Sequence, residues 1–106
     1  PIEIEDEFYY NLKEFKSPSP IVPIMESKMK DGWYMTAWAW ERPQGGRSFG
    51  FSGLHYHGNW NEEVYRRLIF QGILWTLGEE IPKEGVNVSI KEEWLKLPTR
   101  ERSNAQ

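Results

Sequence analysis

Apolar and polar residues alternate with a period of two in several segments, which predicts β-strands. Residues 2–10 alternate Ile and Glu and then turn aromatic, so they predict a short strand or an extended segment. Residues 21–27 form an apolar run in which Pro23 lacks a backbone donor, which predicts an edge or terminal strand. Residues 33–42 give the clearest strand, and both of its faces are largely apolar. One face carries Trp33, Met35, Ala37 and Ala39, and the other carries Tyr34, Thr36, Trp38 and Trp40. Such a strand is typical of an α/β sheet that is covered on both sides.

Turn residues and a change of period extend this prediction towards the C-terminus. Pro-Gln-Gly-Gly at 43–46 predicts a turn, and residues 47–54 predict a return strand that forms an antiparallel hairpin with 33–42. A helical period follows from Asn61 to Leu77, with Asn59 or Asn61 as the cap. Its predicted buried stripe is Val64, Leu68, Ile69, Gly72, Ile73 and Thr76.

Glycine and serine positions refine the ends of the predicted helices. Gly72 costs a helix about 1 kcal/mol relative to Ala, so we expect it to permit a close approach to the sheet. Gly78 is expected just beyond the end of the helix. Ser89 is a candidate cap for a short helix that ends at Leu97, and the polar residues 98–106 are expected to fray.

Length, charge and cysteine content restrict the class of protein. A chain of 106 residues is enough for one small domain. The net charge of -3 and the lack of a basic stripe argue against nucleic-acid binding. No apolar run approaches about 18 residues, so we expect no membrane partner. Cysteine is absent, which excludes a disulfide, a thiolate metal site and a cysteine nucleophile. No signal-peptide pattern is visible, although a processed precursor would have lost one, so we expect a cytoplasmic protein.

Four groups of residues stand out as motifs: Arg42, Pro43, Gly45, Gly46, Arg47 and Phe49 in the hairpin, Gly53 with His55 or His57, Arg66, Arg67, Ile73, Leu74 and Trp75 in the helix, and Asp6, Glu7, Tyr9 and Tyr10 near the N-terminus. Together these motifs resemble the C-terminal part of the ThuA-like (trehalose-utilisation) domain family. The resemblance implies an α/β fold, part of a flavodoxin-like domain related to class I glutamine amidotransferases, with three to four strands and one main helix. Residues 1–88 are then the C-terminal half of a ThuA-like domain, and residues 89–106 a short helix and tail.

Both histidines lie in the stretch Gly-Leu-His-Tyr-His-Gly-Asn-Trp, residues 53–60. By resemblance to amidotransferases, His57 takes the place of the catalytic histidine and Asn59 that of its orienting carboxylate. Without a cysteine, cysteine-dependent amide hydrolysis is excluded. Catalysis by this chain would use His57 as general acid–base and Asp6 or Glu7 as its carboxylate partner.

Three interpretations of the two histidines stay open. In the first, His55 and His57 contact a polar ligand, most simply a sugar, at the sheet edge. In the second they bind a metal ion with Asp6, Glu7 or Glu62 as a third ligand. In the third they form structural hydrogen bonds to the backbone. The first and third are favoured equally over the second, so we expect no tightly bound metal and no cofactor.

Other side chains are candidates for the same ligand site, and each has a structural alternative. Tyr9 and Asn59 are candidate ligand contacts, while the carboxylates near Tyr9 also fit a solvated face. Trp38, with Trp40, is a candidate platform for sugar stacking or part of the core. Arg47 could grip an anionic group, but pairing with Glu41 is favoured. Arg66 and Arg67 are expected at the surface.

The sequence therefore predicts a ThuA-like protein of carbohydrate metabolism, acting on trehalose or a related sugar, with its exact reaction unassigned. The alternative is a non-catalytic half-domain that persists as an oligomer. We expect a homodimer or a higher homo-oligomer, because one helix covers one face of the sheet. Candidates for the uncovered apolar face are Tyr34, Trp38 and Phe51.

Overall fold

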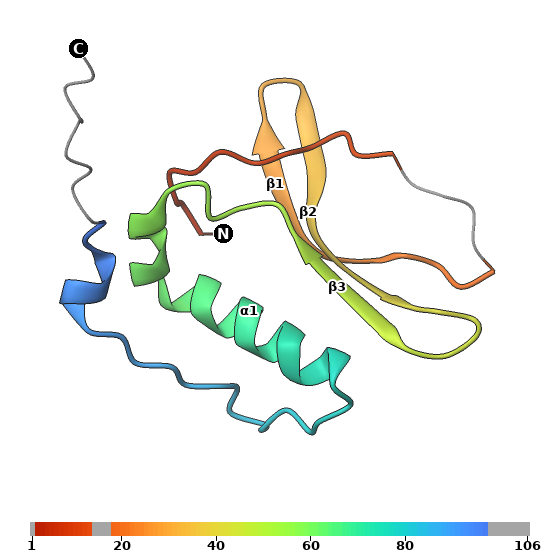
Figure 1. The fold of residues 1–106 in the computed structure, drawn as a ribbon. Coiled ribbons are helices and arrows are strands. Elements are labelled where there is room, and N and C mark those ends of the chain that lie inside the picture. The colour runs from red at the N-terminus through yellow and green to blue at the C-terminus, as the bar shows by residue number, and fades with distance from the viewer. Residues whose placement is uncertain (1, 14–17, 98–106) are drawn as a thin grey trace, which may run out of the picture.

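A three-stranded antiparallel sheet lies beside one α-helix in the computed structural model, which describes residues 2–13 and 18–97 (Figure 1). The elements are β1 (Val22–Met29), β2 (Gly32–Glu41), β3 (Arg47–Phe51), the 3-10 helix η1 (His57–Asn61), α1 (Glu63–Thr76) and the 3-10 helix η2 (Glu92–Leu95). The mixed α/β class, with three strands and one main helix, is confirmed, and it fits a partial α/β domain.

The strand order is β1-β2-β3, and each neighbouring pair is antiparallel, as two successive hairpins require. The predicted edge position of residues 21–27 is confirmed, because β1 is an outer strand. Its pairing with β2 is irregular around Pro23 and Met25, where a ladder donor is missing. At the second hairpin, Gly45 and Gly46 adopt φ of +102° and +89°, values that glycine reaches without a steric cost.

The register of β2 and β3 decides which side chains face α1. Ala39 pairs with Phe49 and Ala37 with Phe51, so these four share the helix-facing side. Phe51 was predicted on the uncovered face, but its pairing with Ala37 places it on the helix side. There its ring meets the ring of Tyr65 edge-on, with 5.1 Å between centroids.

Gly72 brings α1 against β3, as the sequence predicts. A methyl group in place of its hydrogen would lie 2.5 Å from the Phe49 ring, which is shorter than any contact a real Cβ makes. Gly72 and Tyr65 are the buried residues of α1. Tyr65 was missing from the predicted stripe, and Ile73, which was included in it, is half exposed.

The start of α1 differs from the prediction, whereas its end agrees. Asn59 and Asn61 belong to η1, and Glu62 occupies the cap position of α1 without a side-chain hydrogen bond. The predicted cap is wrong for Asn59 because its side-chain amide donates instead to the carbonyl of Glu5, at 2.7 Å. Gly78 adopts a φ of +74°, as expected for the residue that ends a helix in the left-handed conformation.

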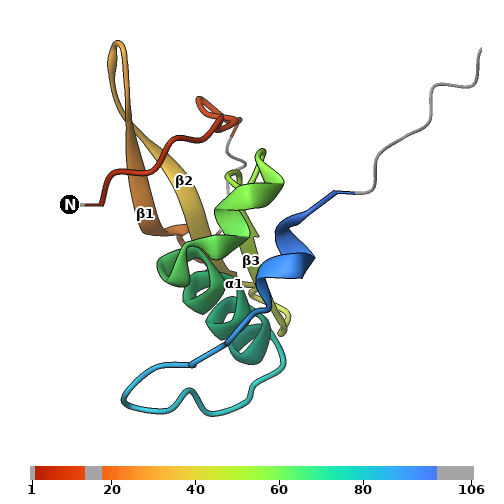
Figure 2. The same cartoon turned by 90° about the vertical axis from the view of Figure 1, so that its left-hand side faces the viewer.

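After α1 the chain turns back and runs along the helix towards η2 (Figures 1 and 2). Arg66 holds this return segment, because its guanidinium donates to the carbonyls of Val88, Trp60 and Asn61 at 2.9, 2.8 and 2.7 Å. Arg66 was expected at the surface; it is partly buried there, and these three bonds give it a structural role that the prediction did not include. The predicted Ser89 cap is also not formed, since η2 begins at Glu92 after Lys91. The tail at 98–106 lies outside the described residues.

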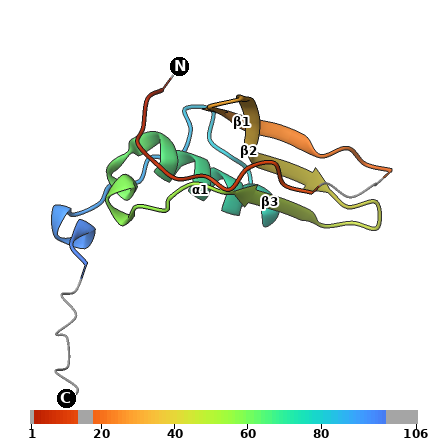
Figure 3. The ribbon, with the colours of Figure 1, turned by 90° about the horizontal axis from the view of Figure 1, so that it is seen from above.

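The helix covers only part of the sheet. It packs along β3 and η1, and it does not lie over β1 or β2 (Figure 3). Among the described residues, the buried apolar side chains are Ala37, Ala39 and Tyr65. A core this small leaves many large apolar side chains partly exposed.

Candidate functional site

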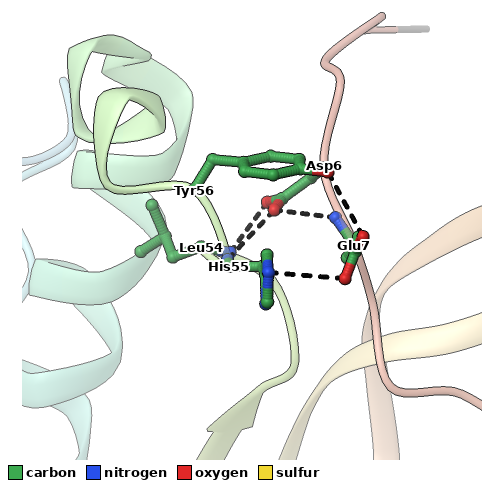
Figure 4. A network of polar contacts seen from close by, with 5 residues as sticks. All are labelled: Asp6, Glu7, Leu54, His55 and Tyr56. Atoms are coloured by element: carbon green, nitrogen blue, oxygen red, sulfur yellow. Dashed lines mark hydrogen bonds and ion pairs between the residues drawn. The ribbon is translucent and has the colours of Figure 1, made fainter.

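The N-terminal segment crosses the sheet and meets the histidine stretch at the end of β3 (Figure 4). The carboxylate of Asp6 makes this contact: Oδ2 accepts the backbone N–H of Leu54 at 2.7 Å, and Oδ1 accepts that of His55 at 3.0 Å. Oδ1 also accepts the N–H of Glu7 at 2.9 Å. One carboxylate therefore joins two segments that are 48 residues apart in the sequence.

Leu54 explains why a carboxylate is needed at this point. Its φ of 64° lies in the left-handed region, which costs a residue with a Cβ roughly 1–2 kcal/mol. In this conformation the amides of Leu54 and His55 both point at Asp6. The charged hydrogen bonds to Asp6 offset the backbone strain.

The pKa of Asp6 reflects the same contacts. Partial burial acts to raise it, but hydrogen bonds from the Leu54 amide, the Tyr65 hydroxyl and the amides of Glu7 and His55 outweigh burial and hold the pKa below its usual value. For Tyr65, burial and its bond to Asp6 raise the pKa. The Asp6 carboxylate is therefore ionised at neutral pH.

Glu7 gathers a second, more exposed set of contacts. Its Oε2 lies 3.4 Å from His55 Nε2, and its Oε1 accepts the hydroxyl proton of Tyr56 at 3.3 Å. The charge of Glu7 is the main cause of a raised pKa at Tyr56. The side chains of His55 and Glu7 are 52% and 65% exposed, so both are open to a ligand. We call Asp6, Glu7, His55 and Tyr56 the Asp6–His55 cluster.

His57 has a different neighbour. Its Nε2 lies 2.8 Å from the carbonyl oxygen of Trp94, and because a carbonyl only accepts, Nε2 is the protonated nitrogen. This bond ties η1 to η2. The predicted pairing of His57 with Asp6 or Glu7 does not correspond to these contacts, since both carboxylates contact the stretch 54–56. Asn59 reaches the backbone of the N-terminal segment at Glu5.

The remaining predicted ligand contacts are spread over the molecule. Trp38 covers Gly50 on the face of the sheet that α1 does not occupy. Arg47 pairs with Glu41 at 3.9 Å, as favoured, and also donates to the Trp75 carbonyl at 3.1 Å with its guanidinium over the Trp75 ring. Tyr9 is highly exposed. The structure thus brings Asp6, Glu7 and His55 together and places Arg47 at the other end of β3.

Three residues of the site were not singled out by sequence reasoning, and one of them is Tyr65, whose hydroxyl bonds to Asp6. Tyr56 contributes a hydroxyl, and Leu54 contributes only its backbone N–H. Tyr56 lies between the two histidines, which was a usable indication. The strained backbone of Leu54 gave none, because leucine does not favour positive φ.

Two grooves lie on the helix-facing side of the sheet. The first, about 670 Å³, lies between β1 and α1 and includes Val22, Ile24, Phe49, Leu68 and Trp75 in its lining. The second, about 750 Å³, lies where the N-terminal segment passes Trp33, Val64 and Tyr65. The histidines line neither groove.

Metal and membrane features were sought in the same part of the chain. Across residues 2–13 and 18–97, no three His, Cys, Asp or Glu side chains group closely enough to hold a metal ion. No helix there has both the length and the apolar character needed to cross a bilayer.

Comparison with protein-family models, curated proteins and solved structures gives no match to the chain. The fold and the site therefore define a small mixed α/β domain with a carboxylate–imidazole cluster at one end of its sheet.

Proposed function

We propose that this chain is a ThuA-like protein of carbohydrate metabolism, and that the Asp6–His55 cluster binds its sugar, trehalose or a related saccharide. One observation carries the proposal. Asp6 and Glu7 belong to one motif of the family resemblance and His55 to another, and these motifs contact each other directly across 49 residues of sequence. The same proposal includes a cytoplasmic location and a fold that corresponds to part of a flavodoxin-like domain.

The chemistry of the cluster suits a neutral polyol. Sugar hydroxyls donate well to carboxylate oxygens, and Glu7 is exposed enough to accept them. The His55 imidazole can donate or accept, and Tyr56 offers a partly exposed ring beside it, with 5.1 Å between the His55 and Tyr56 centroids. Asp6 is already occupied by backbone amides, so its part is to hold the shape of the site.

The contacts within the cluster also bear on the acid–base assignment. A general base must lie within hydrogen-bond reach of its partner, and Glu7 has that relation to His55. In this proposal His55 is the histidine that Glu7 orients, while His57 supports the site through η2. The competing prediction from the sequence pairs His57 with Asp6 or Glu7. Replacing each histidine in turn distinguishes the two assignments.

A second candidate function is a non-catalytic half-domain. The observation that favours it is the bond from His57 to the Trp94 carbonyl, which is the structural use of a histidine. In that case sugar turnover is absent and replacement of His57 affects only stability.

A saccharide titration followed by ¹H–¹⁵N NMR tests the proposal. We expect trehalose or a related disaccharide to shift the amide signals of Glu7, His55 and Tyr56 with a dissociation constant below about 10 mM, equivalent to a free energy of only about 3 kcal/mol. His55→Ala and Glu7→Gln should each weaken binding at least about tenfold, or 1.4 kcal/mol. Glu84→Gln, an exposed carboxylate elsewhere, is the matched control. No shift at the cluster with any of a panel of mono- and disaccharides would refute the proposal.

A further inference from the structure

The helix α1 is apolar on two opposite sides. Its inner side carries the buried Tyr65 and Gly72, which face β3. Phe70 and Ile73, with Leu77 directly after the helix, are 38–69% exposed. Their spacing of three and four residues puts them on one stripe, and at about 100° per residue that stripe lies on the side away from Gly72. We call Phe70, Ile73 and Leu77 the outer stripe.

A helix that packs on a single sheet needs only one apolar stripe. The return segment after α1 contacts Arg66, Gln71 and the guanidinium of Arg67 and borders the first groove through Ile81, yet it leaves Phe70, Ile73 and Leu77 38–69% exposed. The pattern is that of a helix lying between two layers.

The sheet carries a matching apolar surface that is only partly covered. In β1, Val22 and Ile24 are about half exposed, at 49% and 50%, although they border the first groove. The opposite wall of that groove is α1, through Leu68 and Trp75. Neighbouring helices pack 8–10 Å apart, about the width of two strands, so a second helix beside α1 would lie over β1 and β2.

We propose that two copies of the chain pair about a two-fold axis, with their α1 helices side by side between the two sheets. Each helix keeps its inner side on its own β3 and places its outer stripe in the β1–α1 groove of the other copy. The contact is reciprocal, so both surfaces of both chains are used and the assembly closes at two copies.

The exposed apolar area favours a second copy as the occupant. A half-exposed large side chain shows roughly 100 Å², so Val22, Ile24, Phe70, Ile73 and Leu77 together show roughly 500 Å² per chain. A stable interface buries about 800 Å² per partner, and the polar rim of the groove, which includes Arg42 and Gln71, lies next to the apolar part. Both halves of the contact are present on one chain, so no other protein is required. The Asp6–His55 cluster lies outside both surfaces, and the inference does not depend on the proposed sugar.

Sedimentation or light scattering at about 50 µM, well above the micromolar constants of ordinary interfaces, gives the first test. We expect a single species of twice the 12.6 kDa chain mass. Ile73→Glu should convert it to a folded monomer, because Ile73 is half exposed within one chain and its replacement leaves the inner side of α1 intact. Leu97→Glu, an exposed apolar residue outside both surfaces, should leave the dimer unchanged.

Cysteine trapping tests the contact itself and does not depend on the folding of a charged variant. The chain has no cysteine, so Ile24→Cys combined with Ile73→Cys introduces the only pair. We expect rapid oxidation to a covalent dimer, whereas Ile24→Cys with Leu97→Cys should stay reduced under the same conditions. A cooperatively folded 12.6 kDa species at 50 µM, a dimer indifferent to Ile73→Glu, or equal trapping of both cysteine pairs would each overturn the proposal.

Discussion

Asp6→Asn is the sharpest perturbation of the site, because it exchanges one oxygen of the Asp6 carboxylate for an amide group at nearly constant volume. Asn keeps one acceptor oxygen, and its NH₂ group then faces a backbone N–H that it cannot accept. One of the two bonds that join Asp6 to Leu54 and His55 is therefore lost. Leu54 has to keep its positive φ with less support.

The expected loss follows from the kind of bond removed. A hydrogen bond to a charged group contributes about 1.5–3 kcal/mol net, and partial exposure of this one favours the lower end. We therefore expect the free energy of unfolding to fall by about 1.5–2 kcal/mol at pH 7. For a domain of this size that corresponds to a decrease in Tm of roughly 10 °C.

The dependence on pH identifies the cause. The pKa of Asp6 is lowered in the folded protein from its reference value of 3.8, so its contribution is complete above about pH 5 and is lost as the pH falls through the folded pKa. Urea unfolding of both proteins, from pH 7 to about pH 3, should show the difference shrinking below about pH 4. Glu3→Gln removes one exposed charge nearby and is the control. Equal stability at pH 7, or a difference that does not change with pH, would refute the role given to the carboxylate.

Three further pairs of substitutions test other parts of the structure. In chemical unfolding, Leu54→Val should lower the free energy of unfolding by about 2 kcal/mol and Leu54→Asn by less than about 1 kcal/mol. The reason is that Asn tolerates a positive φ, whereas a β-branched residue does not. Equal losses for the two variants would contradict the strain argument. Gly72→Ala should cost about 1–2 kcal/mol by overpacking against Phe49, while Gly58→Ala, which meets no atom within 4 Å, is neutral in the same denaturant series. Arg66→Met should lower Tm by roughly 10 °C, because it removes three hydrogen bonds to carbonyl oxygens. Arg67→Met breaks only a surface ion pair with Glu63 and should change Tm by about 2 °C. Similar shifts for the two variants would show that the three bonds of Arg66 do not contribute to stability.

Local patterns predicted the secondary structure well where one periodicity dominated. The hairpin of β2 and β3 follows from alternation and from Gly45 and Gly46, and the end of α1 follows from Gly78. The close packing at Gly72 also followed from sequence, because a glycine within a helix needs a steric reason. These features depend on neighbours in the chain, which a sequence displays directly.

Features that depend on distant segments were predicted less well. Asn59 was expected to cap α1, but a carbonyl from the N-terminal segment competes for its amide. Tyr65 was also left out of the predicted buried stripe, and it is buried by contacts with other segments: its ring packs on Phe51 and its hydroxyl bonds to Asp6. The approach of Asp6 and Glu7 to the histidine stretch came from a family resemblance, and periodicity alone gave no indication that His55 would be the contact.

The two hydrogen bonds from Leu54 and His55 to Asp6, which we call the Asp6 clamp, also have a kinetic consequence. The two hairpins and α1 form through contacts close in sequence, whereas the clamp must close a loop of 48 residues, and such loops close late and open first. The N-terminal segment should therefore detach while the sheet and the helix stay folded. In hydrogen exchange, the amides of Leu54 and His55 would then report this partial opening at rates faster than those of β2. A ligand held by Glu7 and His55 would slow that exchange by keeping the segment in place.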